Sequence, residues 1–190
     1  MNAYVTLTLL FGLFAFVHSL TAADFFKQRA ETMFGIRGAR YRLLYTLLSF
    51  PSALPFVAFW FVTRGKTPVL FHVTGFTAIL VLLAKFVGAA ILVASLLQTG
   101  IGEFLGLRPE RRRLVTTGLY ARVRHPMYLG AIVFIWASPE LRYLDALLYT
   151  LATLYFAFGI YIEERRLLAS FGPEYESYRS RVPAILPRFK

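Results

Sequence analysis

The chain contains no cysteine among its 190 residues, which excludes disulfide bonds and thiolate-ligated metal sites. It is also poor in charge: only 16% of its residues are Asp, Glu, Lys or Arg, whereas soluble domains carry about 25%. Acidic residues are the scarcer class, with 10 of them against 21 Lys and Arg. Hydrophobic residues, in contrast, make up 57% of the chain. This balance indicates a membrane protein rather than an ordinary soluble domain.

Long apolar runs fill most of the sequence. A helix that crosses the hydrocarbon core needs about 20 mainly apolar residues. Runs near or above that length lie at 4–20, 43–62, 71–97 and 141–162, and a shorter fifth run lies at 127–137. We predict an all-α, integral membrane helical bundle with about five transmembrane helices, the fourth short and paired with the fifth. A single membrane domain would comprise 1–190, with a three-helix part at 1–98 and a C-terminal part at 99–190.

The net charge of +11 is better explained by topology than by a nucleic-acid partner. Lys and Arg gather in three segments, with five in 27–42, six in 108–124 and six in 165–190. With five spans these segments all face one side of the membrane, and only Arg64, Lys66 and Arg142 face the other. The positive-inside rule then predicts an N-terminus outside and a C-terminus in the cytoplasm, in the inner membrane of a prokaryote.

Several residues interrupt the apolar runs of the N-terminal half. Lys85 lies near the middle of 71–97, where a charged side chain costs at least about 2.5 kcal/mol. It either faces a wet cavity, pairs with a carboxylate such as Asp145, or extends its stem toward the surface. His18 is either a polar helix end at the interface or part of a site. Pro51 and Pro55 are expected to kink the run 43–62, because each removes a backbone donor.

The stretch "RVRHPMYLG" places cations directly before the short run 127–137. Eleven residues of helix rise only about 16 Å, which cannot cross a hydrocarbon core of about 30 Å. The start of this helix is therefore expected to lie below the headgroups, or the segment pairs with the next helix in a shallow hairpin at "ASPELRY". Either arrangement draws Arg124 and His125 inward. Pro126 suits the first turn of such a helix. The stretch thus favours a site, although Arg122 can still serve as an interfacial anchor.

The last apolar run continues as a helix until Gly172 and Pro173, which form a strong stop signal. Glu163 and Glu164 lie on this extension, and adjacent helical residues point about 100° apart, so the two cannot have the same role. Cations, a histidine, tyrosines and two carboxylates therefore gather around one recessed cytoplasmic cavity. Such a set suits a small zwitterionic molecule with an aromatic group.

These motifs have a known counterpart. The stretches "LVTTGLYARVRHPMYLG" and "EERRLLASFGPEYESYRSRVPAILP" resemble the membrane methyltransferase superfamily of isoprenylcysteine carboxyl methyltransferases and phospholipid methyltransferases. The signature is G-x-Y, then R-H-P-x-Y, then a Glu-Glu pair, then F-G-x-x-Y-x-x-Y, and all four parts occur in order within 114–187. The N-terminal half, with "HSLTA", a downstream lysine and "YRLLY", more loosely resembles NnrU-type proteins and methanethiol S-methyltransferases.

The resemblance implies that S-adenosylmethionine binds in the C-terminal half, without a Rossmann domain, and leaves as S-adenosylhomocysteine. It implies that His125, Tyr128 and either Glu163 or Glu164 contact the cofactor, with Arg124 near its carboxylate. The animal isoprenylcysteine enzymes have more spans than this chain, so their substrate does not transfer with the motif. The other residues that the resemblance assigns to this pocket are Leu114, Val115, Gly118, Tyr120, Pro126, Tyr175 and Tyr178, the last two at its cytoplasmic side.

Methyl transfer from a sulfonium requires that donor and acceptor be held in line. A carboxylate acceptor needs no base, whereas a thiol or amine must lose a proton, for which His125 is the candidate catalytic residue. Arg124 is the second candidate, because it could orient an acidic acceptor. We expect a small or lipophilic acceptor (a thiol, a prenylcysteine carboxylate or a lipid amine) that enters from the bilayer.

Two other functions fit the same sequence. In a small-solute transporter, Lys85 and His18 would line a path through the bilayer, but polar residues should then occur at all depths instead of collecting on one side. A non-catalytic membrane assembly factor of the NnrU type would retain the cofactor fold without the chemistry.

Overall fold

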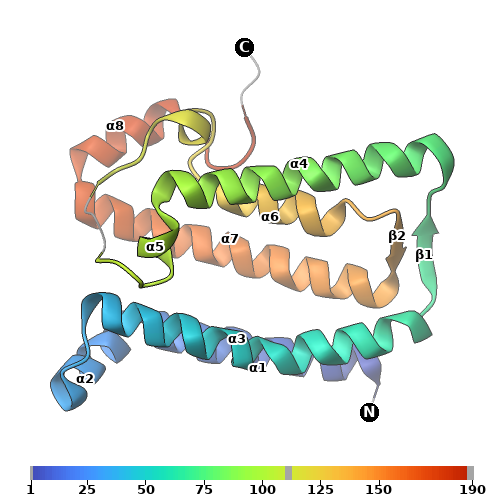
Figure 1. Ribbon diagram of the computed structural model, residues 1–190, viewed down its shortest axis with the longest axis horizontal. Coiled ribbons are helices and arrows are strands. Elements are labelled where there is room, and N and C mark those ends of the chain that lie inside the picture. Colours follow the sequence, from blue (N-terminus) through green and yellow to red (C-terminus); the bar gives the residue numbers. More distant parts are fainter. Residues whose placement is uncertain (1, 110–112, 188–190) are drawn as a thin grey trace. The chain divides into compact units, whose positions relative to one another are not determined.

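The computed structural model describes residues 2–109 and 113–187. Arg111, Arg112, Arg188 and Lys190, which are among the cations counted above, lie outside these ranges. Within the described ranges, four helices are long and apolar enough to cross a membrane. They are α1 (Ala3–Ala22), α3 (Gly38–Thr63), α4 (Gly75–Thr99) and α7 (Tyr143–Phe171), shown in Figure 1. The predicted all-α integral membrane class is confirmed.

The predicted number of about five transmembrane helices is not confirmed. The expected short segment forms α6 (Pro126–Trp136), a helix of 11 residues that is apolar but shorter than the four spanning helices. The remaining elements connect or follow these helices. They are α2 (Asp24–Phe34), η1 (Arg64–Lys66), β1 (Val69–His72), α5 (Ile101–Phe104), η2 (Gly118–Ala121), β2 (Glu140–Arg142) and α8 (Pro173–Arg181).

The beginning of the predicted span 71–97 is not helical. Residues Val69–His72 form β1, which pairs with β2 in a two-stranded sheet, and α4 begins only at Gly75. Gly75 has a φ of 59°, a left-handed conformation that glycine adopts without strain. Because apolar β-branched and aromatic residues also favour extended chain, hydropathy alone placed the start of the helix too early. The stretch "ASPELRY", where a hairpin between the short helix and the last one was predicted, contains the extended residues of β2.

The described residues form two compact units. The first comprises 2–70, 100–109 and 142–151, and the second comprises 71–99, 113–141 and 152–187, so that α7 is divided after Leu151. In the first unit α1 packs against α3, and Leu7 and Phe11 of α1 are buried. The ring centroid of Phe56 on α3 lies 5.3 Å from that of Phe11 and 5.0 Å from that of Phe14. The hydrophobic pairing of these two helices is therefore largely aromatic.

The start of α7 belongs to the first unit through a buried carboxylate. Asp145 is 0% exposed and accepts hydrogen bonds from Arg64 Nε at 2.8 Å and from Trp60 Nε1 at 2.8 Å. The backbone N–H of Arg142 donates to the same carboxylate at 3.0 Å. A buried carboxylate needs such partners, so this group fixes the first turn of α7 to the end of α3.

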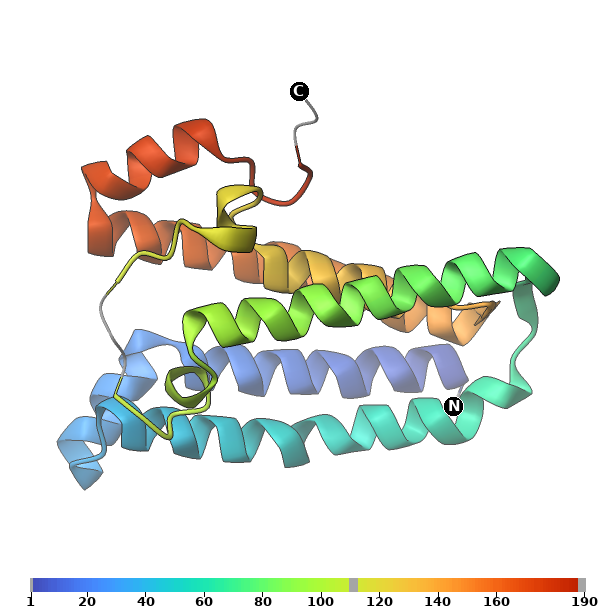
Figure 2. The same cartoon turned by 45° about the horizontal axis from the view of Figure 1, so that its top comes forward.

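In the second unit α4 and α6 lie side by side, as Figures 1 and 2 show. A Cβ atom on Gly88 would lie 2.6 Å from Phe134 N, and one on Gly130 would lie 2.6 Å from Leu92 N. Only residues without a side chain permit this approach, which is a common way for membrane helices to pack. The following helix, predicted to pair with α6, contacts it through side chains such as Tyr128 and Phe156.

Lys85 donates hydrogen bonds to the carbonyls at the C-terminal end of α6. Its Nζ lies 2.9 Å from Phe134 O and 3.4 Å from Ala137 O, and 4.5 Å from the centroid of the Phe134 ring. The last carbonyls of a helix lack internal donors, and this cost is high where water is absent. The structure therefore gives Lys85 carbonyl partners rather than the Asp145 carboxylate considered above.

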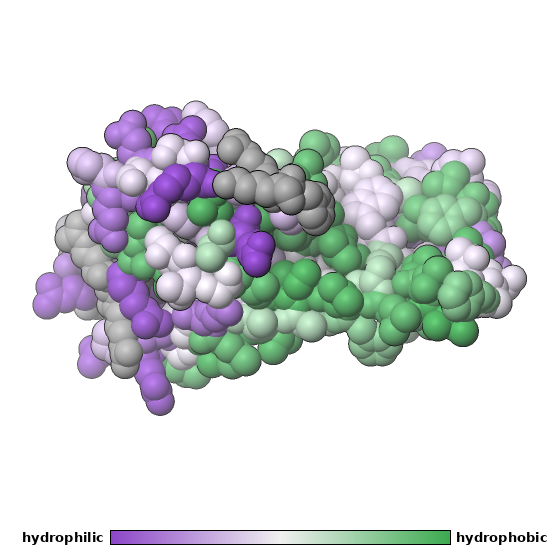
Figure 3. Space-filling view, turned by 90° about the horizontal axis from the view of Figure 1, so that it is seen from above, coloured by the Kyte–Doolittle hydropathy of each residue, from purple (hydrophilic) through white to green (hydrophobic). Residues whose placement is uncertain are grey.

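The outer surface of α4 is apolar, as expected of a helix in contact with lipid. In Figure 3 hydrophilic residues cover the α8 end of the second unit, and hydrophobic residues cover α4 beyond it. Phe76 and Phe86 are 73% and 70% exposed. An apolar surface of this extent is stable in hydrocarbon but not in water, so the chain is an integral membrane protein.

We expect Gly130→Ala to lower the free energy of unfolding by about 1–3 kcal/mol, because its new methyl group would overlap the backbone of α4. Gly12→Ala on α1 is the matched control, since a Cβ there meets nothing within 4 Å. This control should be neutral or stabilising by up to about 1 kcal/mol. Unfolding in detergent micelles, followed by circular dichroism, measures both, and equal stabilities would contradict the close packing of α4 and α6.

Candidate functional site

The loop that precedes α6 is held by the C-terminal segment of the chain. Pro126 is the first residue of α6, and His125 directly before it has a φ of −124° and a ψ of 60°, which is neither helical nor extended. The backbone N–H of Arg124 donates to Pro183 O at 2.9 Å, and that of His125 donates to Ala184 O at 3.0 Å. These two bonds fix the backbone from which the Arg124 and His125 side chains extend.

Glu164 on α7 is the centre of the site. Its carboxylate accepts hydrogen bonds from Arg124 Nε at 2.8 Å, His125 Nε2 at 2.7 Å and the Tyr175 hydroxyl at 2.7 Å. The side chains of Glu164 and Arg124 are 13% and 10% exposed, and Tyr175 is fully buried. Arg179 approaches the other carboxylate oxygen at 3.5 Å. Charge-assisted bonds at this depth are strong and require that all partners be present together.

The guanidinium of Arg124 is almost fully engaged. Nε and Nη2 donate to Glu164, and Nη1 donates to the carbonyls of Arg179 and Val182. These bonds use four of the five N–H donors of the group. Arg124 therefore joins α7 to the segment after α8. Its neighbour Arg122, expected to be an interfacial anchor, is exposed.

Glu163 has different surroundings from Glu164. Its side chain is 42% exposed, although the adjoining His125 side chain is only 2% exposed. Tyr128 hydrogen-bonds to Glu163, and His125 Nδ1 lies 3.7 Å from its Oε2. Because Nε2 donates to Glu164, Nδ1 is the nitrogen that faces Glu163. The site thus has one enclosed carboxylate and one accessible carboxylate on either side of the same imidazole.

Helix α8 contributes two buried phenols. Tyr175 and Tyr178 are three residues apart and share a helix face. The Tyr178 hydroxyl donates to Tyr120 O at 2.6 Å, which attaches α8 to η2. Burial raises the pKa of the Tyr178 phenol to about 12. Burial, together with the nearby Glu163 carboxylate, raises the pKa of the Tyr120 phenol to about 12 as well. Both groups are neutral donors at physiological pH.

The loop before η2 approaches the end of α4. Leu114 and Val115 are half-buried, and Gly118 has a φ of 62°. A Cβ on Gly118 would lie 2.5 Å from Gln98 Nε2. Gln98 Oε1 accepts from the Leu119 N–H at 3.2 Å, so this side chain holds the loop in place. Sequence reasoning missed Gln98, because a polar residue at a helix end carries no signal of its own.

The second unit therefore brings together most residues that the sequence assigned to one pocket. Arg124, His125 and Glu164 are in direct contact, and Tyr128 and Glu163 adjoin them. Sequence reasoning also missed Arg179 and the carbonyls of the C-terminal segment, which complete the surroundings of Arg124. Of the other predicted residues, Tyr175 donates directly to Glu164, whereas Tyr178, Tyr120 and Gly118 contact the framework around this cluster. Leu114 and Val115 are half-buried in the loop before η2, and Pro126 is the buried first residue of α6.

Comparison with known proteins gives an independent line of information. Residues 6–161 match the family described as NnrU protein. The chain is 34% identical over 191 residues to methanethiol S-methyltransferase 2 of Bradyrhizobium diazoefficiens, in an alignment that covers 95% of this chain and 71% of the relative. It is 32% identical over 197 residues to methanethiol S-methyltransferase of Mycobacterium tuberculosis, in an alignment that covers 98% of this chain and 79% of the relative.

A second group of relatives matches a smaller part of the chain. Over 85 residues the chain is 42% identical to protein-S-isoprenylcysteine O-methyltransferase of Schizosaccharomyces pombe, in an alignment that covers 42% of this chain and 35% of the relative. No solved structure matches the chain significantly.

The two glutamates should differ in their contribution to stability. Glu164→Gln leaves the charge of Arg124 without its buried partner, so we expect the free energy of unfolding to fall by about 3 kcal/mol. Glu163→Gln alters a side chain that is 42% exposed and should change it by less than about 1 kcal/mol. Thermal unfolding of both variants in the same detergent compares them directly. A larger loss for Glu163→Gln would reverse the assignment of the enclosed and accessible carboxylates.

The Tyr178 phenol should contribute a pH-dependent stability. Its pKa of about 12 in the folded chain lies above the ordinary value of 10.0, so this contribution is fully present below pH 10 and is lost as the pH rises through 12. We expect Tyr178→Phe to lower stability by about 1 kcal/mol near neutral pH. The variant should also lose less stability than the wild type between pH 10 and 12. The exposed Tyr143→Phe is the control, and identical alkaline profiles for all three proteins would contradict this expectation.

Proposed function

Given that the chain belongs to the NnrU family and is an integral membrane methyltransferase, we propose that its methyl donor is S-adenosylmethionine and its acceptor a small thiol. The observation that carries this proposal is the pair of carboxylates beside His125, one enclosed by Arg124 and the other accessible. We place this site on the cytoplasmic side, with the N-terminus outside, in the inner membrane of a prokaryote. The positive-inside distribution of Lys and Arg supports that orientation.

The accessible residues suit the charge of the donor. S-Adenosylmethionine, when bound, supplies an electrophilic methyl group on a positively charged sulfur, and it also carries an ammonium and ribose hydroxyls. The Glu163 carboxylate can accept hydrogen bonds from such donors, and the ring of Tyr128 can face a cation. Glu163, rather than Glu164, is the carboxylate that contacts the donor, because Glu164 is already occupied by Arg124, His125 and Tyr175.

Arg124 acts as a positioning residue in this scheme. Its guanidinium donates to Glu164 and to the chain after α8, and it thereby holds the loop that carries His125. The single N–H that these bonds leave on Nη2 can still contact a carboxylate on the donor or acceptor. Losing this group would therefore shift the position of the imidazole as well as remove a contact.

His125 is the group that can deprotonate a thiol. Its Nε2 proton is held by Glu164, so Nδ1 accepts the proton of the S–H group. The imidazolium that results lies between two carboxylates, with Glu164 at 2.7 Å and Glu163 at 3.7 Å, and both stabilise its charge. The thiolate formed is the nucleophile for methyl transfer. Release of a proton at Nδ1 restores the starting state.

The extent of the similarity favours a thiol over the other acceptors. The relatives that cover 95% and 98% of this chain are methanethiol S-methyltransferases. The isoprenylcysteine enzyme resembles only 42% of the chain. A prenylcysteine carboxylate or a lipid amine is therefore the less favoured acceptor. In each case a lipophilic substrate can reach the site from the bilayer.

Calorimetry with S-adenosylhomocysteine tests the donor site. We expect the purified chain to bind it and Glu163→Gln to weaken binding by about tenfold or more, the effect of losing a charged hydrogen bond. Glu176→Gln, an exposed glutamate on α8, is the matched control and should bind normally. If the wild type bound no S-adenosylhomocysteine and His125→Ala changed nothing in any assay, the proposed site would be wrong.

A methyl-transfer assay with a panel of acceptors tests the substrate class. We expect transfer to methanethiol and other small thiols, and little transfer to a prenylcysteine or a lipid amine. His125→Gln should lower kcat for thiols by about 100-fold or more while S-adenosylhomocysteine binding changes less, because it removes the base but not the accessible carboxylate. Preferred transfer to the prenylcysteine would overturn the thiol assignment and leave the donor site intact.

A further inference from the structure

A second polar cluster joins α1 to α3 inside the first unit. His18 of α1 has a hydrogen-bond partner at each ring nitrogen, with Ser49 Oγ 3.0 Å from Nδ1 and the Tyr45 hydroxyl 2.5 Å from Nε2. Both partners lie on α3. None of the three residues belongs to the methyl-transfer site.

The hydrogen bonds around Ser49 determine where the protons lie. The Ser49 hydroxyl donates to Tyr45 O at 2.7 Å, so its oxygen can only accept from His18. Nδ1 of His18 therefore carries the proton, and Nε2 accepts from the Tyr45 hydroxyl. The three hydrogen bonds thus run from the Tyr45 hydroxyl through His18 and Ser49 back to Tyr45 O, and all three groups are neutral.

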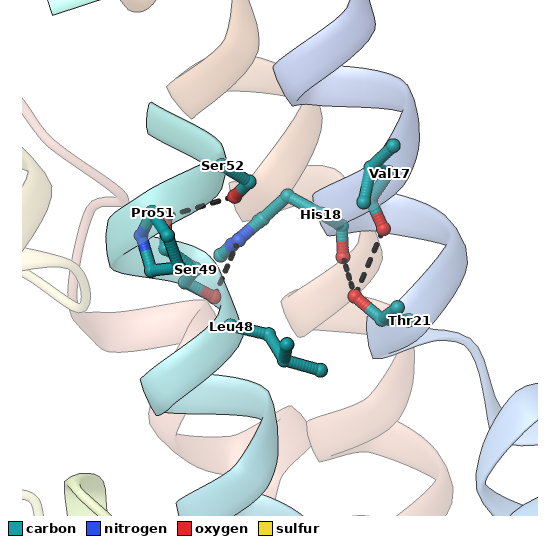
Figure 4. A pocket seen from close by; sticks show the side chains of 7 residues that line it. All are labelled: Val17, His18, Thr21, Leu48, Ser49, Pro51 and Ser52. Atoms are coloured by element: carbon teal, nitrogen blue, oxygen red, sulfur yellow. Dashed lines mark hydrogen bonds between the residues drawn. The ribbon is translucent and has the colours of Figure 1, made fainter. Parts of the chain in front are cut away.

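This cluster borders a pocket of about 260 Å³, which Figure 4 shows from close by. The seven residues that line it are Val17, His18, Thr21, Leu48, Ser49, Pro51 and Ser52. Pro51 has no N–H, so the turn of α3 beside the pocket lacks one of its usual backbone bonds. The walls are mainly apolar, and the polar atoms come from His18 and three hydroxyl groups.

The hydroxyl groups of the lining present acceptors rather than donors. Thr21 donates to Val17 O at 2.9 Å, and Ser52 donates to Ser49 O at 2.8 Å. The hydroxyl protons are thus used on the backbone, and oxygen lone pairs remain for a ligand. The seven lining residues include no acid, Lys or Arg, so an ion would find no opposite charge there.

We propose that this pocket between α1 and α3 binds a small apolar molecule that carries one O–H or S–H group. The lone pairs of Thr21 and Ser52 accept its hydrogen bond, and Val17, Leu48 and Pro51 surround its apolar part. A cavity of about 150 Å³ can hold benzene. The pocket of about 260 Å³ therefore has room for a phenol, a benzenethiol or a short-chain alcohol. This inference does not depend on the proposed methyl transfer.

Imidazole NMR offers a direct test, because the chain has only three histidines. The full-length protein, labelled with ¹⁵N at its imidazole rings and held in detergent micelles, would be titrated with phenol and separately with toluene. We expect phenol to shift the His18 signals in a saturable way and to leave those of His72 unchanged. Toluene has nearly the same shape but no donor, so it should bind at least threefold more weakly, the effect of one hydrogen bond of about 1 kcal/mol.

Variants separate the hydrogen bond from the cavity. Thr21→Val with Ser52→Ala removes both acceptors and should weaken phenol binding about three- to tenfold. Thr8→Val on the same helix is the matched control, since Thr8 makes the same kind of bond to Tyr4 O but does not line the pocket. Ser52→Leu should fill the space and abolish binding, with unchanged His72 and His125 signals as proof of folding.

Three results would overturn the proposal. One is the absence of any saturable shift of His18 with phenol or benzenethiol. The second is equal affinity for toluene and phenol, which would indicate a purely apolar cavity. The third is equal phenol binding by the double variant and Thr8→Val. None of these results bears on S-adenosylhomocysteine binding, so they leave the donor site untouched.

Discussion

The ion pair of Glu164 and Arg124 is the interaction on which the α8 end of the second unit depends. Both side chains are nearly enclosed, and neither charge is stable there without the other. Arg124 also binds the carbonyls of Arg179 and Val182, so the same pair fixes α7, the loop before α6 and the segment after α8. The orientation of His125 follows from this arrangement, since its Nε2 donates to the same carboxylate. Glu163 remains accessible because Glu164 is the carboxylate that pairs with Arg124.

A second constraint comes from the length of α6. α6 is an apolar helix of only 11 residues, and its last carbonyls lack donors within the helix. Lys85 of α4 supplies donors at that end, and Gly88 and Gly130 let the two helices approach closely enough for it to do so. The charge of Lys85 is costly within an apolar run, but its ammonium donates to backbone carbonyls that would also be costly to leave without a hydrogen bond.

Much of this structure follows from the sequence, and the failures have physical causes. Long apolar runs predicted the four spanning helices, and the R-H-P motif with the Glu-Glu pair predicted which residues meet. The 100° offset of Glu163 and Glu164 predicted different roles but not which one is enclosed, because that depends on Tyr175 and Arg124. Gln98 and the start of α4 were missed for a related reason. Their positions are set by contacts to distant backbone, which local hydropathy does not encode.

The two histidines with defined partners show how one side chain can serve two kinds of chemistry. His125 lies between carboxylates, which stabilise the positive charge that it gains on accepting a proton. His18 lies between the hydroxyls of Ser49 and Tyr45, and the residues that line the adjoining pocket include no acid. The surroundings of His125 suit proton transfer, whereas those of His18 suit a fixed tautomer and a neutral ligand. The difference arises from the residues around each ring and not from depth alone, because both rings lie next to apolar helices.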